Sequence, residues 1–357
     1  MGAPLSNSTR KLLLMTSFLL LILANTSGPL LLRFYYVKGG SRIWFVTWLQ
    51  TGGWPIILIP LFISYFNRRK TDPVNAKLFH VPFPAIISAA VLGTILGVTN
   101  FLYAIAAQRL PVSTSTLILA SNLIFTAFAA FLLVKQKFTP YSVNAVVLLT
   151  AGAAALALHA SSDRPEGQSK KSYAIGFAMM FISAALTGLV FPGLELVYKK
   201  TKLALTFELV TEIQLLLTFS ATVFATIGMI INNDFKVISR EAGQFLLGET
   251  KYYVVIISIA IIFQLSFLGV VGIIFCASAL VNGIITTVLL PITEVLAVIF
   301  FHDKFTSEKG MSLALCLWGF ISHLYGEYRA SKKQNQIIMQ ESAIYTPNIA
   351  PAVELQP

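Results

Sequence analysis

Apolar runs about as long as a membrane-spanning helix recur along the chain, and they limit its fold more than any other feature. A hydrocarbon core of about 30 Å requires roughly 20 apolar residues per helix. Runs of this length are separated here by clusters of charge, proline and glycine. In addition, 56% of the residues are hydrophobic and 11% are charged, which lies far from the composition of soluble domains. The sequence therefore predicts an all-α polytopic membrane protein.

Ten such segments can be delimited, with ends defined to within a few residues. The eighth and ninth have no polar break between them, so their division rests on their combined length. We expect ten transmembrane helices, approximately at Lys11–Leu32, Ile43–Phe66, Pro82–Ala107, Val112–Val134, Pro140–Ala160, Tyr173–Leu194, Leu205–Ile231, Tyr252–Phe275, Cys276–Phe301 and Glu308–Gly326.

A polar loop, Ser161–Ser172, leaves five segments on either side, and the two halves share a faint repeat. Phe131–Gly152 aligns without gaps with Val298–Gly319, matching a Lys-Phe-Thr triplet and a glycine. Because five is odd, equivalent halves would insert with opposite orientation, as in inverted-repeat transporters. A chance match of a short triplet is the alternative. The expected domains are a first repeat over 1–162, a loop over 163–172, a second repeat over 173–328 and a disordered tail over 329–357.

The formal net charge of +11 is carried by lysines and arginines in the predicted loops and tails. Positive charge in such places orients helices against anionic headgroups, so we expect a lipid bilayer and no nucleic acid as partner. Basic residues divide almost equally between the two sides of the membrane. The clusters at Asn67–Lys70 and Lys199–Lys202 favour cytosolic termini, and we expect a multi-pass protein of the plasma membrane.

Two glutamates lie near the start of the seventh segment. Glu208 and Glu212 are four residues apart and share a helix face. Glu208 can reach the headgroups, whereas Glu212, about 10 Å into the helix, cannot easily do so. A desolvated carboxylate favours its protonated form, so Glu212 could hold a proton in one conformation and release it in another. A carboxyl hydrogen-bonded to a neighbouring helix is the structural alternative.

A third acidic residue, Glu294, follows Pro291 in the ninth segment. A proline in mid-helix frees a backbone carbonyl, and transporters place ligands at broken helices. Glu294 is therefore a second candidate for proton coupling. The alternative is a kink that serves packing, with Glu294 extending outward.

Neutral amides and aromatic rings supply the candidate binding groups. Amides both donate and accept hydrogen bonds, which suits the mixed edge of a purine, and an aromatic ring suits its face. Trp48 and Tyr103 are candidates for the face, whereas Trp44, near a helix start, reads as an interfacial anchor. The candidate amides for substrate binding are Gln50, Asn100, Asn122, Gln214 and Gln264, with Asn282 a further neutral amide inside a predicted helix.

What the sequence lacks limits its chemistry. No lysine or arginine occupies the interior of a predicted helix, so a strongly anionic substrate would find no counter-charge there. We therefore expect a small neutral or cationic heterocycle. The four histidines have no metal-ligand spacing, and neither a phosphate-binding loop nor a nucleophile elbow occurs. The sequence predicts neither an enzyme nor a cofactor.

Several collinear motifs carry a resemblance to a known family. Gly39–Pro55 and Phe101–Phe125 resemble the plant purine permeases of the drug/metabolite transporter superfamily, over roughly Lys11–Tyr325. The resemblance implies a ten-helix inverted-repeat carrier, usually proton-coupled, that imports adenine, cytokinins or related heterocycles, and in some members alkaloids or vitamin B6 compounds. Further matching stretches are Lys137–Thr150, Val270–Leu280 and Leu296–Phe305.

The resemblance also assigns roles to individual residues. The family's Leu-Gln-Thr glutamine falls on Gln50, and its Glu-x-Gln element falls on Glu212 and Gln214. Thr99 stands where an acidic residue is often found, which weakens a proton route through the third segment. Asn122 stands where many relatives have Gln, and the shorter side chain would enlarge the pocket.

These observations lead to one hypothesis, proton-coupled uptake of a purine-like heterocycle by alternating access. Alternatives are an alkaloid or vitamin B6 permease on the same fold and an exchanger for phosphorylated sugars or nucleotide-sugars. A membrane receptor or scaffold without transport is the alternative from a different class.

Overall fold

The computed structural model describes most of the chain, and every regular element in the described part is helical. The described residues are 7–71, 79–112, 115, 118–119, 121–135, 138–159, 169–201 and 206–301, with scattered residues between 307 and 332. The elements are α1 (Asn7–Val37), α2 (Ile43–Thr51), α3 (Pro55–Thr71), α4 (Phe83–Arg109), α6 (Asn122–Val134), α7 (Pro140–His159), α8 (Lys170–Lys200), α9 (Phe207–Ile231), the short 3-10 helix η2 (Asp234–Lys236), α10 (Ile238–Gln244), α11 (Glu249–Cys276) and α12 (Ala279–Phe301).

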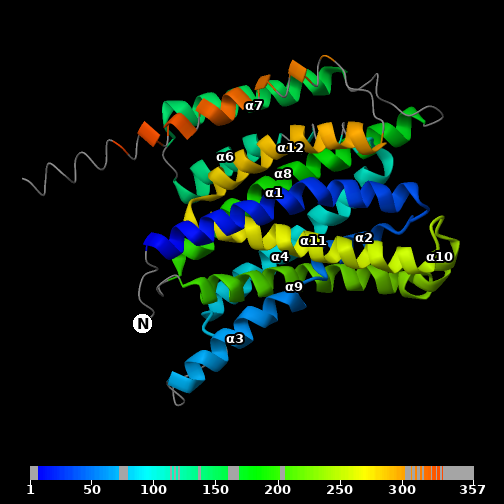
Figure 1. Ribbon diagram of the computed structural model, residues 1–357, viewed down its shortest axis with the longest axis horizontal. Coiled ribbons are helices and arrows are strands. Elements are labelled where there is room, and N and C mark those ends of the chain that lie inside the picture. Colours follow the sequence, from blue (N-terminus) through cyan, green and yellow to red (C-terminus); the bar gives the residue numbers. More distant parts are fainter. Residues whose placement is uncertain are drawn as a thin grey trace, which may run out of the picture.

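Most of these helices lie side by side and run lengthwise through the molecule (Figure 1). Among the described residues, six helical stretches are long and apolar enough to cross a membrane. This confirms the prediction of an all-α polytopic membrane protein. The count of ten spans and their division into two repeats stay predictions. The six stretches are Arg10–Val37, Ile43–Lys70, Phe83–Arg109, Lys170–Lys200, Glu208–Ile231 and Glu249–Cys276.

The second predicted segment is not one continuous helix. It divides into α2 and α3 at Gly52–Gly53, where the Gly52 amide donates to the Trp48 carbonyl at 2.6 Å. Pro55 is the first residue of α3, a position at which its missing N–H costs nothing. A Cβ at Gly53 would lie 2.7 Å from both the Ala260 carbonyl oxygen and the Gln264 Cβ, so only glycine allows α11 this close.

Other boundaries differ less. The eighth and ninth segments do separate, between Cys276 and Ala279, within a few residues of the predicted division. Ser278 begins α12 by accepting a hydrogen bond from the Val281 amide at 3.2 Å. The connection between α9 and α11 contains η2 and α10, which the sequence analysis did not anticipate. The predicted disordered tail lies almost entirely outside the described residues.

Close packing depends on small residues at the helix contacts. α1 packs mainly on α11, and α4 packs between α8 and α9. A Cβ at Gly269 of α11 would lie 2.9 Å from the Ser17 carbonyl of α1, so this glycine lets the two backbones approach. One large apolar cluster joins α4, α8, α9 and α11, and a second joins α1, α2, α10 and α11.

Long-range contacts define the two ends of the bundle. The Arg10 guanidinium donates to the Cys276 carbonyl at 2.6 Å, so the start of α1 meets the end of α11. We call this the Arg10 end, and the ends of α3 and α8 and the starts of α4, α9 and α12 lie there too. The opposite end, which we call the α10 end, holds the start of α2, α10 and the start of α11 (Figure 1).

Candidate functional site

Four amide side chains are buried in α2 and in the three helices that surround it. α2 packs against α4, α9 and α11, and each of these helices contributes one amide. All four are at most 8% exposed. Within the described part of the chain, the side-chain nitrogen of each has no hydrogen-bond partner, and Gln264 lacks one for its oxygen as well. The four are Gln50 of α2, Asn100 of α4, Gln214 of α9 and Gln264 of α11.

Buried amides without partners are costly, because each unsatisfied group forfeits about 1–3 kcal/mol of hydration. Native interiors satisfy most such groups, and the exceptions mark places where water or a ligand supplies the partner. Four unsatisfied amides on adjoining helices therefore indicate a place where water or a ligand binds. All four residues were candidates from the sequence.

The break after α2 helps to assemble this group. Gln50 lies two residues before Gly52, where α2 ends. Because Gly53 contacts the stem of Gln264, the end of α2 is held directly against α11. Gly52, Gly53 and Pro55 are residues that favour a helix break, but they lie inside an apolar run that was predicted as one helix.

Gln214 belongs to a polar stripe along α9. Thr211, Gln214, Thr218 and Thr222 are all buried and recur at three- or four-residue spacing. The Thr218 and Thr222 hydroxyls donate to the carbonyls four residues earlier, at 2.9 and 2.8 Å, so their hydrogen bonding is satisfied inside the helix. Gln214 is left as the amide of this stripe that offers a free donor to the interior.

The aromatic side chains near these amides in the sequence pack against other helices, and the roles of Trp48 and Tyr103 in binding stay predictions. Trp44 stacks on Phe101, the neighbour of Asn100, with ring centroids 3.9 Å apart and planes at 23°. It also contacts Phe224 of α9, so Trp44 packs against two helices from the start of α2, and its role as an interfacial anchor stays a prediction. Trp48 packs against Gly52 in the wall of an apolar groove of about 340 Å³. Tyr103 packs within two apolar clusters.

Two further candidates lie apart from these amides or cannot be placed. Asn122 opens α6, and its Oδ1 accepts a hydrogen bond from the Thr126 hydroxyl at 3.0 Å. α12 runs through Pro291 as one helix. The side chain of Glu294 lies outside the described part of the structure, so its role stays a prediction.

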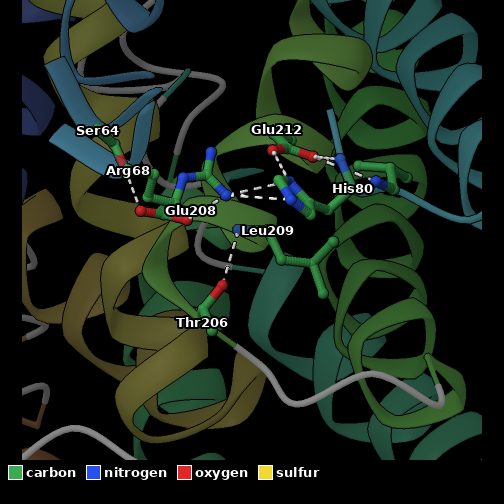
Figure 2. A network of polar contacts seen from close by, with 8 residues as sticks. Ser64, Arg68, His80, Thr206, Glu208, Leu209 and Glu212 are labelled. Carbon is green, nitrogen blue, oxygen red and sulfur yellow. Dashed lines mark hydrogen bonds and ion pairs between the residues drawn. The ribbon is translucent and has the colours of Figure 1, made fainter. Parts of the chain in front are cut away.

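Glu212 is fully buried and is held by the main chain (Figure 2). Its Oε2 accepts hydrogen bonds from the His80 amide at 2.7 Å and the Val81 amide at 3.2 Å. Val81 precedes Pro82, which favours an extended backbone and leaves these amides free to donate. Glu212 therefore ties the start of α9 to the segment before α4. This contact resembles the structural alternative considered for Glu212, although its donors belong to a connecting segment and not to a helix.

A second layer of contacts surrounds this carboxylate. His80 Nδ1 lies 3.4 Å from Glu212 Oε1, and Arg68 Nη1 lies 3.1 Å from His80 Nε2. A neutral imidazole with its proton on Nδ1 would satisfy both contacts. Arg68 also pairs with Glu208 at 3.0 Å, and the Ser64 hydroxyl donates to Glu208 (Figure 2). We call these contacts the Glu212 clamp.

The clamp explains how α9 begins. Thr206 caps the helix, its hydroxyl accepting from the Leu209 amide at 3.2 Å, so the first turn carries Glu208 and the second Glu212. Glu208 is 30% exposed, in keeping with its predicted place near the surface. The sequence analysis missed His80 and Arg68, because neither lies in a predicted helix interior and their partner is far along the chain.

Another carboxylate ties helices at the same end. Glu195 of α8 accepts from the Ala279 amide at 2.8 Å and pairs with Lys199 at 3.0 Å. The start of α12 is thereby fixed to the end of α8. Across the described residues, no group of three or more His, Cys, Asp or Glu side chains could hold a metal ion.

The helices long and apolar enough to span a membrane, together with the buried amides between them, define this protein as an integral membrane protein with polar groups in its interior. A family model for purine nucleobase transmembrane transport matches residues 12–333. The chain therefore belongs to the purine nucleobase transporter family, and the resemblance to the purine permeases is confirmed.

Individual relatives agree with the family match. Purine permease 3 of Arabidopsis thaliana is 46% identical over 93% of this chain and 95% of its own length. Purine permease 2 of the same plant is 43% identical over 91% and 94%. These relatives are permeases, so the prediction that the chain is not an enzyme is confirmed. A solved structure described only as "Crystal structure of protein" has a TM-score of 0.59 over 91% of this chain and 99% of its own, at 15% identity, and shows a shared fold.

Proposed function

We propose that this protein takes up a purine or a purine-like heterocycle, such as adenine or a cytokinin, across the plasma membrane. Uptake is driven by proton entry and proceeds by alternating access, with both termini in the cytosol. The observation that carries this proposal is the group of four buried amides without partners around α2. Family membership supports the substrate class.

The amides match the chemistry of such a substrate. A purine presents donors and acceptors along one edge, and an amide can meet either. In this proposal Gln50, Asn100, Gln214 and Gln264 contact the ring edge. Trp48, two residues from Gln50 on α2, or Tyr103, three residues from Asn100 on α4, meets the ring face. Asn122 would then act near the pocket and not inside it.

Alternating access through inverted repeats has support in the packing. If α1 corresponds to α8 and α4 to α11, the contact of α1 with α11 corresponds to the contact of α8 with α4. These are two of the most extensive helix contacts in the described structure. Superimposing each half on the other would place the α1–α11 contact on the α8–α4 contact. Rocking one half against the other about such a pair of contacts is how inverted-repeat carriers expose a central site to each side.

Glu212 is the proposed proton-exchanging group. As a carboxylate it holds the His80 and Val81 amides, and hydrogen bonds to a charged acceptor contribute about 1.5–3 kcal/mol each. A proton taken up by this carboxylate removes the charge and weakens both bonds, which frees the segment before α4. Release of the proton restores the clamp. Glu294 is a less well supported second group.

The transport claim is tested by uptake of radiolabelled adenine into yeast cells that express the protein, with and without a proton ionophore. We expect uptake that the ionophore abolishes. Uptake that persists unchanged with the ionophore would remove the coupling, and absence of uptake would remove adenine as substrate. Competition by zeatin, nicotine and pyridoxine separates a purine carrier from an alkaloid or vitamin B6 permease.

The binding group is tested by Gln264→Leu. Leucine removes two unsatisfied polar atoms, so the empty protein should unfold at the same or a higher temperature, as functional sites are often costly to stability. Adenine uptake should fall at least tenfold, since one good hydrogen bond contributes about 1.4 kcal/mol. Normal uptake by this variant would place the substrate elsewhere. Gln244→Leu, at an exposed amide of α10, is the matched control.

A further inference from the structure

A carboxylate outside every apolar segment closes the α10 end of the bundle. Glu241 lies in α10 and is 6% exposed. It accepts hydrogen bonds from the Tyr35 hydroxyl, from the Tyr252 hydroxyl at 3.2 Å, and from both the amide and the hydroxyl of Ser41 at 3.2 Å. Arg42 Nε lies 3.8 Å away. One side chain thus joins the end of α1, the start of α2 and the start of α11.

The two tyrosine partners of Glu241 are buried more deeply than the acid itself. Tyr35 and Tyr252 are both 0% exposed and contact each other, with ring centroids 6.3 Å apart. Tyr35 also fills the space in front of Gly40, where any side chain would collide with its ring. Breaking these contacts therefore requires the connection between α1 and α2 to move away from α10.

Two further contacts reinforce the same junction. The Leu246 amide, after α10, donates to the Lys38 carbonyl, after α1, at 3.2 Å. Arg42 lies 3.7 Å from Asp234 of η2, and Asn232 donates to the same carboxylate oxygen at 2.8 Å. The Leu246–Lys38 and Arg42–Asp234 contacts both join the connection between α1 and α2 to the connection between α9 and α11.

We propose that Glu241 is the latch of a gate at the α10 end, which substrate can pass only when this carboxylate releases Tyr35 and Ser41. The proposal rests on the carrier function proposed above, in which the site must be sealed from one side while it opens to the other. Glu241 is a positioning residue, since it acts on α1 and α2 and not on the substrate. With cytosolic termini, this gate faces the outside of the cell.

A latch differs from a permanent structural contact in one measurable way. A permanent contact holds in every conformation, so its loss lowers stability without exposing the interior of the folded protein. A latch holds in one conformation, so its loss shifts the population towards an open state in which buried residues meet water. The experiment must therefore measure exposure of a buried position in protein that is still folded.

Thr47 is a suitable reporter position. It lies on α2 little more than one turn below Arg42 and is 0% exposed. Thr47→Cys is introduced into a protein that also carries Cys276→Ser and Cys316→Ser, so that the reporter is the sole thiol. The rate of labelling by a membrane-impermeant maleimide is then measured on the purified full-length protein in detergent, without substrate.

We expect Glu241→Gln to speed labelling of the reporter roughly tenfold, because the amide cannot accept all the bonds of the carboxylate. Glu249→Gln is the matched control, since Glu249 is exposed in the first turn of α11 and makes none of the latch contacts. It should label at the parent rate. Labelling of Glu241→Gln at the parent rate, in protein with an unchanged unfolding temperature, would overturn the latch.

Milder variants decide the question if Glu241→Gln does not fold. Tyr35→Phe and Tyr252→Phe each delete one donor to Glu241 and should speed labelling severalfold. Tyr253→Phe, at an exposed ring next to Tyr252, should not. Lower unfolding temperatures without faster labelling would make Glu241 a permanent contact and refute the proposal. Since labelling needs no substrate, failure of adenine uptake would remove adenine as the substrate without affecting this result.

Discussion

The carboxylates at the two ends of the bundle are held by different kinds of donor. Glu212 at the Arg10 end is held by two main-chain amides and by the partly exposed His80 ring, which Arg68 contacts in turn. Glu241 at the α10 end is held by buried tyrosines and by Ser41. A main-chain donor is removed only by proline, so the amide bonds to Glu212 are most simply tested by substituting their acceptor. The α10 end can be weakened one donor at a time.

The largest effect is expected for Glu212→Gln. The neutral amide keeps one acceptor for the His80 and Val81 amides but can neither carry the proton nor supply the charge. Adenine uptake should fall more than tenfold, as expected when bonds of about 1.5–3 kcal/mol are lost, and the remainder should no longer respond to an ionophore. Uptake assays in yeast check this. Glu208→Gln should retain most activity, and ionophore-sensitive uptake by Glu212→Gln at the normal rate would assign the coupling to another residue.

The second largest effect is expected for Gly53→Ala, in the middle of the bundle. Gly53→Ala forces a Cβ to within 2.7 Å of the Ala260 carbonyl, so α2 and α11 must separate. We expect a loss of stability of about 1–3 kcal/mol, typical of overpacking, together with weaker adenine binding. Gly243→Ala is the control, because nothing lies within 4 Å of that position. Equal unfolding temperatures for the two variants would show that the contact of Gly53 with Gln264 is not tight.

A smaller effect is expected for Arg68→Gln. Arg68 and Glu208 are each 30% exposed, so solvent screens their ion pair and limits its value to about 1 kcal/mol. Uptake should change less than tenfold, and raising the salt concentration should reduce the difference from the parent protein. A salt-independent loss as large as that of Glu212→Gln would mean that Arg68 acts directly in proton exchange.

The smallest effect is expected for Asp234→Asn. Burial raises the pKa of the Asp234 carboxyl, against the opposing effects of Asn232 and Arg42. A raised pKa means that the charged form is disfavoured in the folded state, so Asp234 lowers stability as pH rises through this range. The Asp234→Asn variant should therefore unfold at the same temperature as the parent protein or slightly above it at neutral pH. In acid the two unfolding temperatures should be equal. A large drop at neutral pH would show that the pairing with Arg42 outweighs burial.

Some of this architecture follows from composition and spacing. Apolar runs of about 20 residues define the membrane class because a hydrocarbon core tolerates little else. Buried amides were also identifiable, since Gln50 and Gln264 interrupt such runs at positions that cannot reach water. What local patterns could not supply was the partner of each group. His80 and Glu212 are separated by 132 residues, and Tyr35 and Glu241 by 206.

The prediction of a continuous second helix failed for a physical reason. The run from Ile43 to Phe66 is mostly apolar and carries no charge, and a lipid environment normally forces such a run to be helical so that its amides are bonded. Gly52–Gly53 can break the helix because α11 covers it, which no local pattern reveals. The carboxylate of Glu241 escaped notice because it lies in a polar connection, where acidic residues are ordinarily solvated.

The division between α2 and α3 also has an electrical consequence. Each half-helix carries partial charge at its tips, equivalent to roughly half an elementary charge, negative at a C-terminus and positive at an N-terminus. At Gly52–Trp54 the negative tip of α2 and the positive tip of α3 face the same few residues. The field there changes sign over a short distance. A solute with its own internal dipole is stabilised by such a field, whereas a solute with a single net charge is attracted by one tip and repelled by the other.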